Sequence, residues 1–184
     1  MSNLDELARA YSTFVALPWS PTLAHAQRVW IVIYPPGDER RLRARLGEFE
    51  LGTIRSNHSW KLVDVTSSFA QWLGSHSYRE AYFERPDLLG SAAIDDFDDY
   101  VSSSVRAALK NDQVDDQTVV ALLGVGSLFP FTKVSRLLET VGPAVRGRLV
   151  VFFPGDRDGF NYRLLEARDG WNYLATPIIV EDVL

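Results

Sequence analysis

The segment RVWIVIY, residues 28–34, is a nearly continuous run of apolar residues, several of them β-branched. Such a run is typical of a β-strand covered on both faces, because a strand with one wet face alternates apolar and polar residues. Three further segments are predicted to be strands, and helical patterns lie between them. They are WKLVDVT (60–66), QTVVALLGVG (117–126) and RLVVFFPG (148–155). Strands that alternate with helices indicate right-handed crossovers and a mainly parallel sheet.

Helices are predicted to cover both faces of this sheet. An N-terminal helix begins at Ser2 or Asn3, which can cap it, and has one apolar face. That face consists of Leu4, Leu7, Ala8, Tyr11 and Phe14 or Val15. The segment DERRLRARLGEFE (38–50) is predicted to form one helix, with Leu42, Leu46 and Phe49 on its inner stripe. The remaining predicted helices are 68–74, 77–90, 94–111 and 131–142, the middle two separated by a turn near Leu89 and Gly90.

The end of the chain is predicted to add a final pair of strands, NYRLLEA (161–167) and PIIV (177–180), near an edge of the sheet. We therefore expect residues 1–184 to form a single α/β domain with a mainly parallel sheet, Rossmann-like or degenerate NTPase-like, and an N-terminal helix. The strand order cannot be read from these patterns.

Composition narrows the classes of function. The formal net charge of −5 argues against nucleic-acid binding over the whole surface, because such binding uses clustered Lys and Arg. The chain has no cysteine, which excludes disulfides, Cys-zinc sites, Fe–S clusters and thiol nucleophiles. No apolar run approaches the roughly 20 residues that a membrane-spanning helix needs. We therefore expect a soluble, cytoplasmic protein.

The segment GVGSLFPF (124–131) looks like a phosphate-binding turn, because it follows a predicted strand and precedes a helix. It lacks the Lys-Ser/Thr pair of a Walker loop, since Lys133 is followed by valine. Gly124 and Gly126 match two glycines of the dinucleotide fingerprint, but Phe129 replaces the third. The pattern favours a structural turn, in which Ser127 caps the next helix and the two phenylalanines pack beneath it or form a docking surface.

The sequence contains no complete catalytic motif. The three histidines are far apart and match no His-Glu-x-x-His pattern, and no Gly-x-Ser-x-Gly elbow is present. The acidic run IDDFDDY (94–100) could hold Mg²⁺ or Ca²⁺, but it lacks Asp-x-Asp-x-Asp-Gly spacing. A solvated helix start, favoured by the helix dipole, is the preferred interpretation. We expect no catalytic residue, no cofactor and no metal.

Two linked motifs carry a resemblance to a known family. The segments GVGSLFPFTKVSRLLETV (124–141) and RLVVFFPGD (148–156) resemble the BrxB family of the BREX bacteriophage-exclusion systems. Members of this family share a Gly-x-Gly-Ser-Leu-Phe-Pro-Phe turn and a Phe-Pro-Gly-acidic turn. The ending YRLLEARDGWNYLATPI (162–178) is similar to the tail of one branch of the family. The motif positions in this chain are Gly124, Gly126, Ser127, Phe129, Pro130 and Phe131, then Phe153, Pro154, Gly155 and Asp156.

The resemblance implies a small cytoplasmic phage-defence component with no established catalytic centre. Its partner would be the phosphatase-like PglZ protein, and the methyltransferase PglX and the ATPase BrxC are more distant candidates. We expect a non-enzymatic interaction component that docks through the glycine-turn edge or through Trp171 and Tyr173. One alternative is a degenerate nucleotide- or phosphate-binding regulator with Arg40, Arg41 and Lys133 as anion ligands. Another is a weak nucleic-acid binder that uses the arginine-rich helix.

Overall fold

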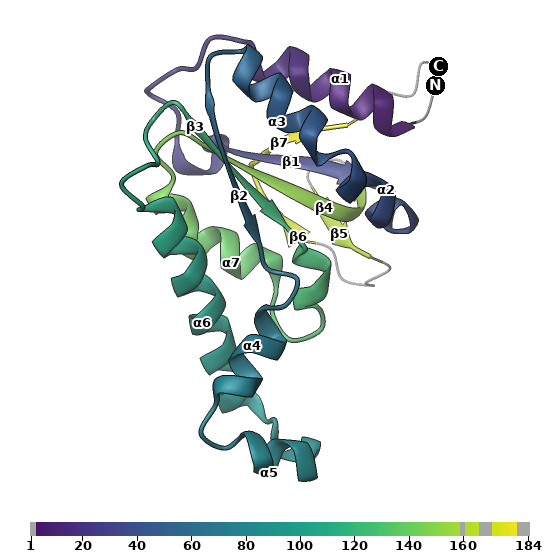
Figure 1. Cartoon of the computed structure of the whole chain (residues 1–184), viewed down its shortest axis with the longest axis vertical. Coiled ribbons are helices and arrows are strands. Elements are labelled where there is room, and N and C mark those ends of the chain that lie inside the picture. The colour runs from purple at the N-terminus through teal and green to yellow at the C-terminus, as the bar shows by residue number, and fades with distance from the viewer. Residues whose placement is uncertain (1–2, 159–160, 166–170, 180–184) are drawn as a thin grey trace.

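The computed structural model describes residues 3–158, 161–165 and 171–179. Its strands form one sheet in the order β2-β3-β4-β1-β7, and all neighbours along this path are parallel (Figure 1). Their bounds are β1 (Val29–Tyr34), β2 (Ser59–Asp64), β3 (Thr118–Leu123), β4 (Arg148–Asp158) and β7 (Thr176–Ile178). The predicted α/β class and parallel sheet are thus confirmed.

The central strands are buried on both faces, which explains their continuous apolar sequences. All of β3, and the first eight residues of β4, are shielded from solvent. Alternate residues enter two different cores: Ile31 of β1 packs on one side of the sheet and Val32 on the other. β2 is half-exposed because it lies at an edge, so its sequence is more polar.

Helices cover both faces of the sheet (Figure 1). The three helices nearest the N-terminus pack their apolar side chains into the core that contains Val32, and three later helices pack theirs into the core that contains Ile31. The first three are α1 (Asn3–Val15), α2 (Glu39–Ala44) and α3 (Leu46–Arg55). The others are α4 (Ser68–Ser75), α6 (Ser91–Leu109) and α7 (Val134–Val141). Short 3₁₀ helices are η1 (His25–Arg28), η2 (Pro36–Asp38), η3 (Pro86–Leu88), η4 (Val125–Leu128) and η5 (Gly142–Ala144). Along the described ranges, none of the helices has the length and apolar character needed to cross a bilayer.

Three features of the predicted elements were wrong. The predicted helix 77–90 is a short helix, α5 (Arg79–Glu84), followed by η3, because Arg85 has a φ of −137° and a ψ of 82° and precedes a proline.

The predicted helix 38–50 is two helices, because the chain bends at Arg45, whose φ is −113° and ψ is 7°. Arg45 forms ion pairs there with Glu48 and with Asp5 of α1, so a tertiary contact holds the bend. Leu42 and Phe49 are nevertheless buried, as their spacing predicts.

The last strands do not pair with one another as predicted. β5 (Asn161–Leu164) lies antiparallel to the end of β4, and β6 (Trp171–Asn172) lies antiparallel to β5. β7 instead pairs with β1 at the edge opposite β2, where Ile31 is in register with Pro177. Local sequence patterns cannot reveal this, because partner choice depends on where the chain crosses the sheet.

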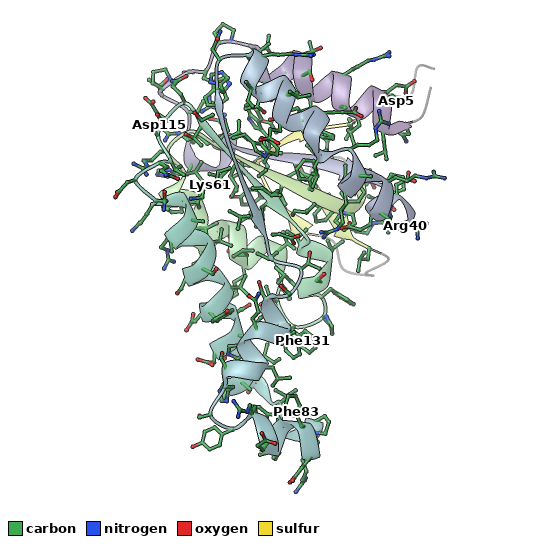
Figure 2. The ribbon with its side chains drawn as sticks, viewed as in Figure 1. Asp5, Arg40, Lys61, Phe83, Asp115 and Phe131 are labelled. Atoms are coloured by element: carbon green, nitrogen blue, oxygen red, sulfur yellow. The ribbon has the colours of Figure 1, made fainter. Side chains whose placement is uncertain are left out.

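A helical arm projects from the sheet (Figure 1). We define the arm as residues 68–100, which comprise α4, α5 (Arg79–Glu84), η3 and the first half of α6. Phe131 lies near the base of the arm and Phe83 near its tip (Figure 2). The predicted turn near Leu89 and Gly90 is confirmed, since α6 begins at Ser91.

Candidate functional site

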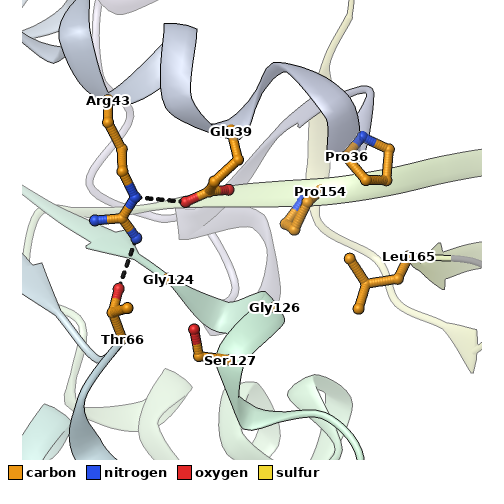
Figure 3. A pocket seen from close by; sticks show the side chains of 9 residues that line it. All are labelled: Pro36, Glu39, Arg43, Thr66, Gly124, Gly126, Ser127, Pro154 and Leu165. Carbon is orange, nitrogen blue, oxygen red and sulfur yellow. Dashed lines mark hydrogen bonds and ion pairs between the residues drawn. The ribbon is translucent and has the colours of Figure 1, made fainter.

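A cleft of about 260 Å³ lies at the carboxyl ends of the first four strands (Figure 3). Sheet register creates it: Asp64 of β2 is paired with Leu123 of β3, so the residues that follow these strands, Thr66 and Gly124, meet. The side chains and backbone around the cleft come from Pro36, Glu39, Arg43, Thr66, Gly124, Gly126, Ser127, Pro154 and Leu165. This is the edge where parallel sheets usually bind ligands.

The glycine turn begins with a left-handed residue. Gly124 has φ +85°, and its carbonyl accepts a hydrogen bond from the N–H of Ser127 at 2.9 Å. Val125 and Leu128 of the same turn are buried. The turn is therefore anchored by two side chains that enter the same core.

The side chains of this turn have different environments. Phe131 stacks on Phe69 of α4 with ring centres 4.0 Å apart, as expected of a packing residue. Phe129 remains 49% exposed, so it does not insert beneath the helix. Ser127 lies at the cleft, and α7 instead begins after Lys133, so the predicted cap by Ser127 is wrong.

The second motif was predicted to form a turn, but this is wrong, because Phe153–Asp156 lie within β4 and pair with β1 and β5. The motif contributes mainly to the core. Phe153, Pro154 and Gly155 are buried, and Asp156 is exposed. A Cβ atom on Gly155 would lie 2.0 Å from the carbonyl oxygen of Arg163, so β5 approaches β4 too closely there for a side chain. Of the four residues of this motif, which were predicted to lie on an interaction surface, Asp156 is the one that is exposed to solvent.

Arg43 is at the centre of a polar network in the cleft. Its guanidinium donates to Glu39 at 2.7 Å, to Asp64 at 3.0 Å and to Thr66 at 2.6 Å. The hydroxyl of Tyr34 donates to the other oxygen of Glu39. Two carboxylates therefore neutralise the cation from within the protein, which leaves it poorly suited to bind an added phosphate.

The network also shifts proton affinities. Burial alone would raise the pKa of Asp64, but hydrogen bonds from Thr66 and the charge and hydrogen bond of Arg43 lower it overall. The pKa of Tyr34 is raised, first by burial and then by its contact with Glu39. The Tyr34 hydroxyl therefore stays protonated and serves as a donor.

The predicted anion ligands lie outside this cleft. Arg40 and Arg41 are exposed, and Arg41 is paired with Asp38 at 3.1 Å. Lys133 is exposed before α7. The arginine that lines the cleft, Arg43, belongs to the same charged run but was not predicted to act there. Its spacing of four residues from Glu39 was the available signal, since such pairs meet on one helix face.

The other predicted groups have local partners. Asp95 and Asp98 form ion pairs with Arg136, and Asp96 accepts a hydrogen bond from the Trp72 indole. In the described part of the chain, no group of three or more His, Asp or Glu residues is placed to hold a metal ion.

The C-terminal aromatics were predicted to cover the last strand or to form a docking patch. Tyr173 is half-buried, and its hydroxyl donates to the Leu138 carbonyl at 3.5 Å. Trp171 is part of β6, but its side chain lies outside the described residues. Tyr173 therefore contacts α7, and its role in docking stays a prediction.

We expect the Asp64→Asn variant to be less stable than the wild type at pH 7 by about 1 kcal/mol, because Asn cannot neutralise Arg43. The loss is no larger because the carboxylate is partly exposed, and solvent screens its charge. A lowered folded-state pKa means that the stabilisation is present above the unfolded pKa of about 3.9 and is lost as the pH falls below it. Urea unfolding of both proteins between pH 7 and pH 3 should therefore show a shrinking difference.

Asp87→Asn is the matched control, since Asp87 forms an exposed ion pair with Arg85. Its effect should be smaller at every pH. A difference between the wild type and Asp64→Asn that stays constant down to pH 3 would contradict the role of the Asp64 charge.

Comparison with known proteins identifies the family. A family model described as BREX protein BrxB matches residues 85–178, a range that contains both motifs, 124–131 and 153–156. No curated protein and no solved structure matches the chain. The chain therefore belongs to the BrxB family, and is a component of a BREX phage-defence system.

Proposed function

We propose that this chain is a non-enzymatic interaction component of a cytoplasmic BREX assembly, and that it binds the phosphatase-like PglZ protein. PglX and BrxC would then be more distant members of the same assembly. The observation that carries the proposal is the exposure of large apolar side chains on the projecting arm. Family membership supports the assembly, and the choice of PglZ rests on the family resemblance.

The arm presents apolar surface that folding alone does not use. Tyr78 is 66% exposed, Phe83 59% and Leu88 47%. Burial of each such side chain against a partner is favourable by roughly 25 cal/mol per Å² of apolar area. Clusters of exposed aromatic residues are typical of protein interfaces. The arm is therefore well suited to dock on another protein.

An aromatic ladder supports the arm from its base. Phe131 of the glycine turn stacks on Phe69, whose ring centre lies 5.7 Å from that of Trp72. Trp72 in turn lies 6.5 Å from Tyr82 of α5 in a stacked arrangement. Packed rings lose little conformational entropy when a partner binds. Phe129 is two residues from Phe131 in the chain and adds an exposed ring to the predicted turn surface.

The chemistry of the cleft supports a non-enzymatic role. Thr66 and Ser127 place hydroxyl groups at the cleft. Within the described residues, neither hydroxyl is hydrogen-bonded to a histidine. His58 stacks on Trp19, and His76 lies in the arm near Tyr82. The Thr66 hydroxyl donates instead to the Asp64 carboxylate, whose lowered pKa makes it a weak general base. The alternative of a phosphate-binding regulator gains no support here, because Arg43 is already neutralised.

The double variant Phe83→Ala/Tyr78→Ala should lower recovery of the PglZ-like protein at least tenfold when the tagged chain is co-expressed with it. Two exposed aromatic anchors are removed, and each typically contributes 1 kcal/mol or more at an interface. Quantitative mass spectrometry of the purified complex gives the measurement. Phe129→Ala tests separately whether the contact extends to the turn.

Leu51→Ala is the matched control, because Leu51 is 51% exposed but belongs to α3 on the other face of the sheet. It should leave recovery unchanged. Equal recovery with the double variant and with the control would contradict docking through the arm. No recovery of the PglZ-like protein by the wild type, with both proteins expressed, would contradict the choice of partner.

A further inference from the structure

A second cleft, of about 210 Å³, lies at the edge of the sheet where the strands begin. It is near Asp115, at the opposite end of the strands from the glycine turn (Figure 2). Val29 of β1 is in register with Leu149 of β4, so the residues before them, Arg28 and Arg148, come together. The residues around this cleft that matter here are Arg28, Arg146, Arg148, Trp19, Gln117 and Asp116.

Arg148 is a buried cation whose hydrogen bonding is incomplete. The residue is 4% exposed, and its guanidinium carbon lies 4.6 Å from the Trp19 ring centre and 5.6 Å from that of Trp30. Nη1 donates to the Gly147 carbonyl at 3.0 Å, whereas the buried Nε has no partner. A buried charged donor without an acceptor is costly unless something compensates it.

The two neighbouring arginines add positive charge to the cleft and do not compensate Arg148. Arg28 donates to backbone carbonyls, including that of Val145 at 3.2 Å, and Arg146 donates to the carbonyl of Asn111 at 2.7 Å. Among the described residues, no carboxylate lies within 4.0 Å of any of the three guanidinium groups. Burial and the charge of Arg28 lower the pKa of Arg148, as expected for a cation without a counter-ion.

We propose that this cleft binds a phosphate-type oxyanion through Arg146 and Arg148, beside which Arg28 adds a positive charge while its own nitrogens donate to backbone carbonyls. A phosphate offers enough acceptor oxygens for several guanidinium donors, and arginine forks match its geometry. The Asp116 carboxylate at the rim restricts the anion to the arginine side of the cleft. The proposal is independent of partner docking, because the cleft contains no residue of the arm.

The aromatic residues exclude recognition of a nucleotide base. One face of Trp19 is stacked on His58 with ring centres 3.7 Å apart, and Arg148 lies over the ring. Trp19 is the aromatic residue that lines this cleft within the described part of the chain, so no free ring face is left there for a base to stack on. The cleft is also smaller than the roughly 300–1,000 Å³ of sites for drug-sized ligands. The bound group is accordingly the phosphate itself, whether it is inorganic or part of a phosphate monoester.

Calorimetric titration of the full chain with inorganic phosphate, AMP and acetate tests the proposal. Phosphate should bind saturably, and Arg146→Gln and Arg148→Met should each weaken binding at least tenfold. Arg106→Gln is the matched control, because Arg106 also donates one hydrogen bond to a carbonyl, that of Thr140. It should bind phosphate like the wild type.

The titrations identify the bound group and can overturn the proposal. Equal affinity for phosphate and AMP would show that the phosphate group alone is recognised, and tighter AMP binding would identify a monoester as the source. No saturable binding of either, equal binding of acetate, or wild-type affinity in Arg146→Gln would overturn the proposal. If Arg148→Met does not fold, the exposed Arg146 still decides the result, since its replacement leaves the core intact.

Discussion

The Gly124→Ala variant should lose about 2–4 kcal/mol of unfolding free energy, which is a large share of a typical domain's stability. Its φ of +85° is strained for alanine and costs about 1 kcal/mol. The added Cβ would also lie 2.2 Å from the Thr66 hydroxyl oxygen and 2.8 Å from the Thr66 backbone nitrogen. The backbone contact can be relieved only if the segment after β2 moves away from the turn after β3, so overpacking adds a further 1–3 kcal/mol.

Urea unfolding followed by circular dichroism measures this loss, and Gly74→Ala is the matched control. Gly74 lies in α4, where an added Cβ would meet no atom within 4 Å. Alanine is also the better helix former there, so the control should be neutral or up to about 1 kcal/mol more stable. A loss below 0.5 kcal/mol in Gly124→Ala would contradict the close approach of Thr66.

This glycine therefore has a structural explanation that needs no ligand. Gly124 lets the chain leave β3 beside Thr66, and Thr66 in turn accepts a hydrogen bond from Arg43. A phosphate loop needs glycine for close approach of the ligand, whereas here the close approach is between two parts of the protein. The Gly-x-Gly pattern is the same in both cases, which is why its sequence alone was ambiguous.

The fold was largely predictable because its signals are local. The apolar run at 28–34 predicts a strand that is buried on both faces. The spacing of the apolar residues from Leu4 to Val15 predicts the buried face of α1. The break at Arg45 was not predictable, because it depends on an ion pair with Asp5 forty residues away. The position of β7 beside β1 also depends on tertiary context, since its three residues carry little pattern of their own.

The candidate sites were less predictable than the fold. Arg43 and Asp64 meet only because β2 lies beside β3, an order that the sequence does not specify. Arg148 is the first residue of β4, and its burial beside two indole rings depends on Trp19, which follows α1. The glycine motifs lie at the carboxyl ends of the strands, whereas the arginine cluster lies where the strands begin and belongs to no motif.

The Phe97→Ala variant should lose about 4 kcal/mol of unfolding free energy. Phe97 has no solvent exposure and lies where α6, α4 and the glycine turn meet. Its ring centre is 5.2 Å from that of Phe69, 5.4 Å from that of Trp72 and 6.3 Å from that of Phe131. Truncation would leave a cavity among rings that are themselves held by the arm, so the surroundings cannot easily collapse into it.

Phe83→Ala makes the comparison specific, because it removes the same side chain from an exposed position on the same arm. Its unfolding free energy should stay within about 0.5 kcal/mol of the wild type. In co-purification, Phe83→Ala should then weaken partner binding without loss of stability, whereas Phe97→Ala should weaken both. If Phe97→Ala instead costs less than 1 kcal/mol, the aromatic ladder does not hold the arm, and a partner would have to order the arm as it binds. The two variants therefore distinguish an arm that is already ordered in the free protein from an arm that becomes ordered only when a partner binds.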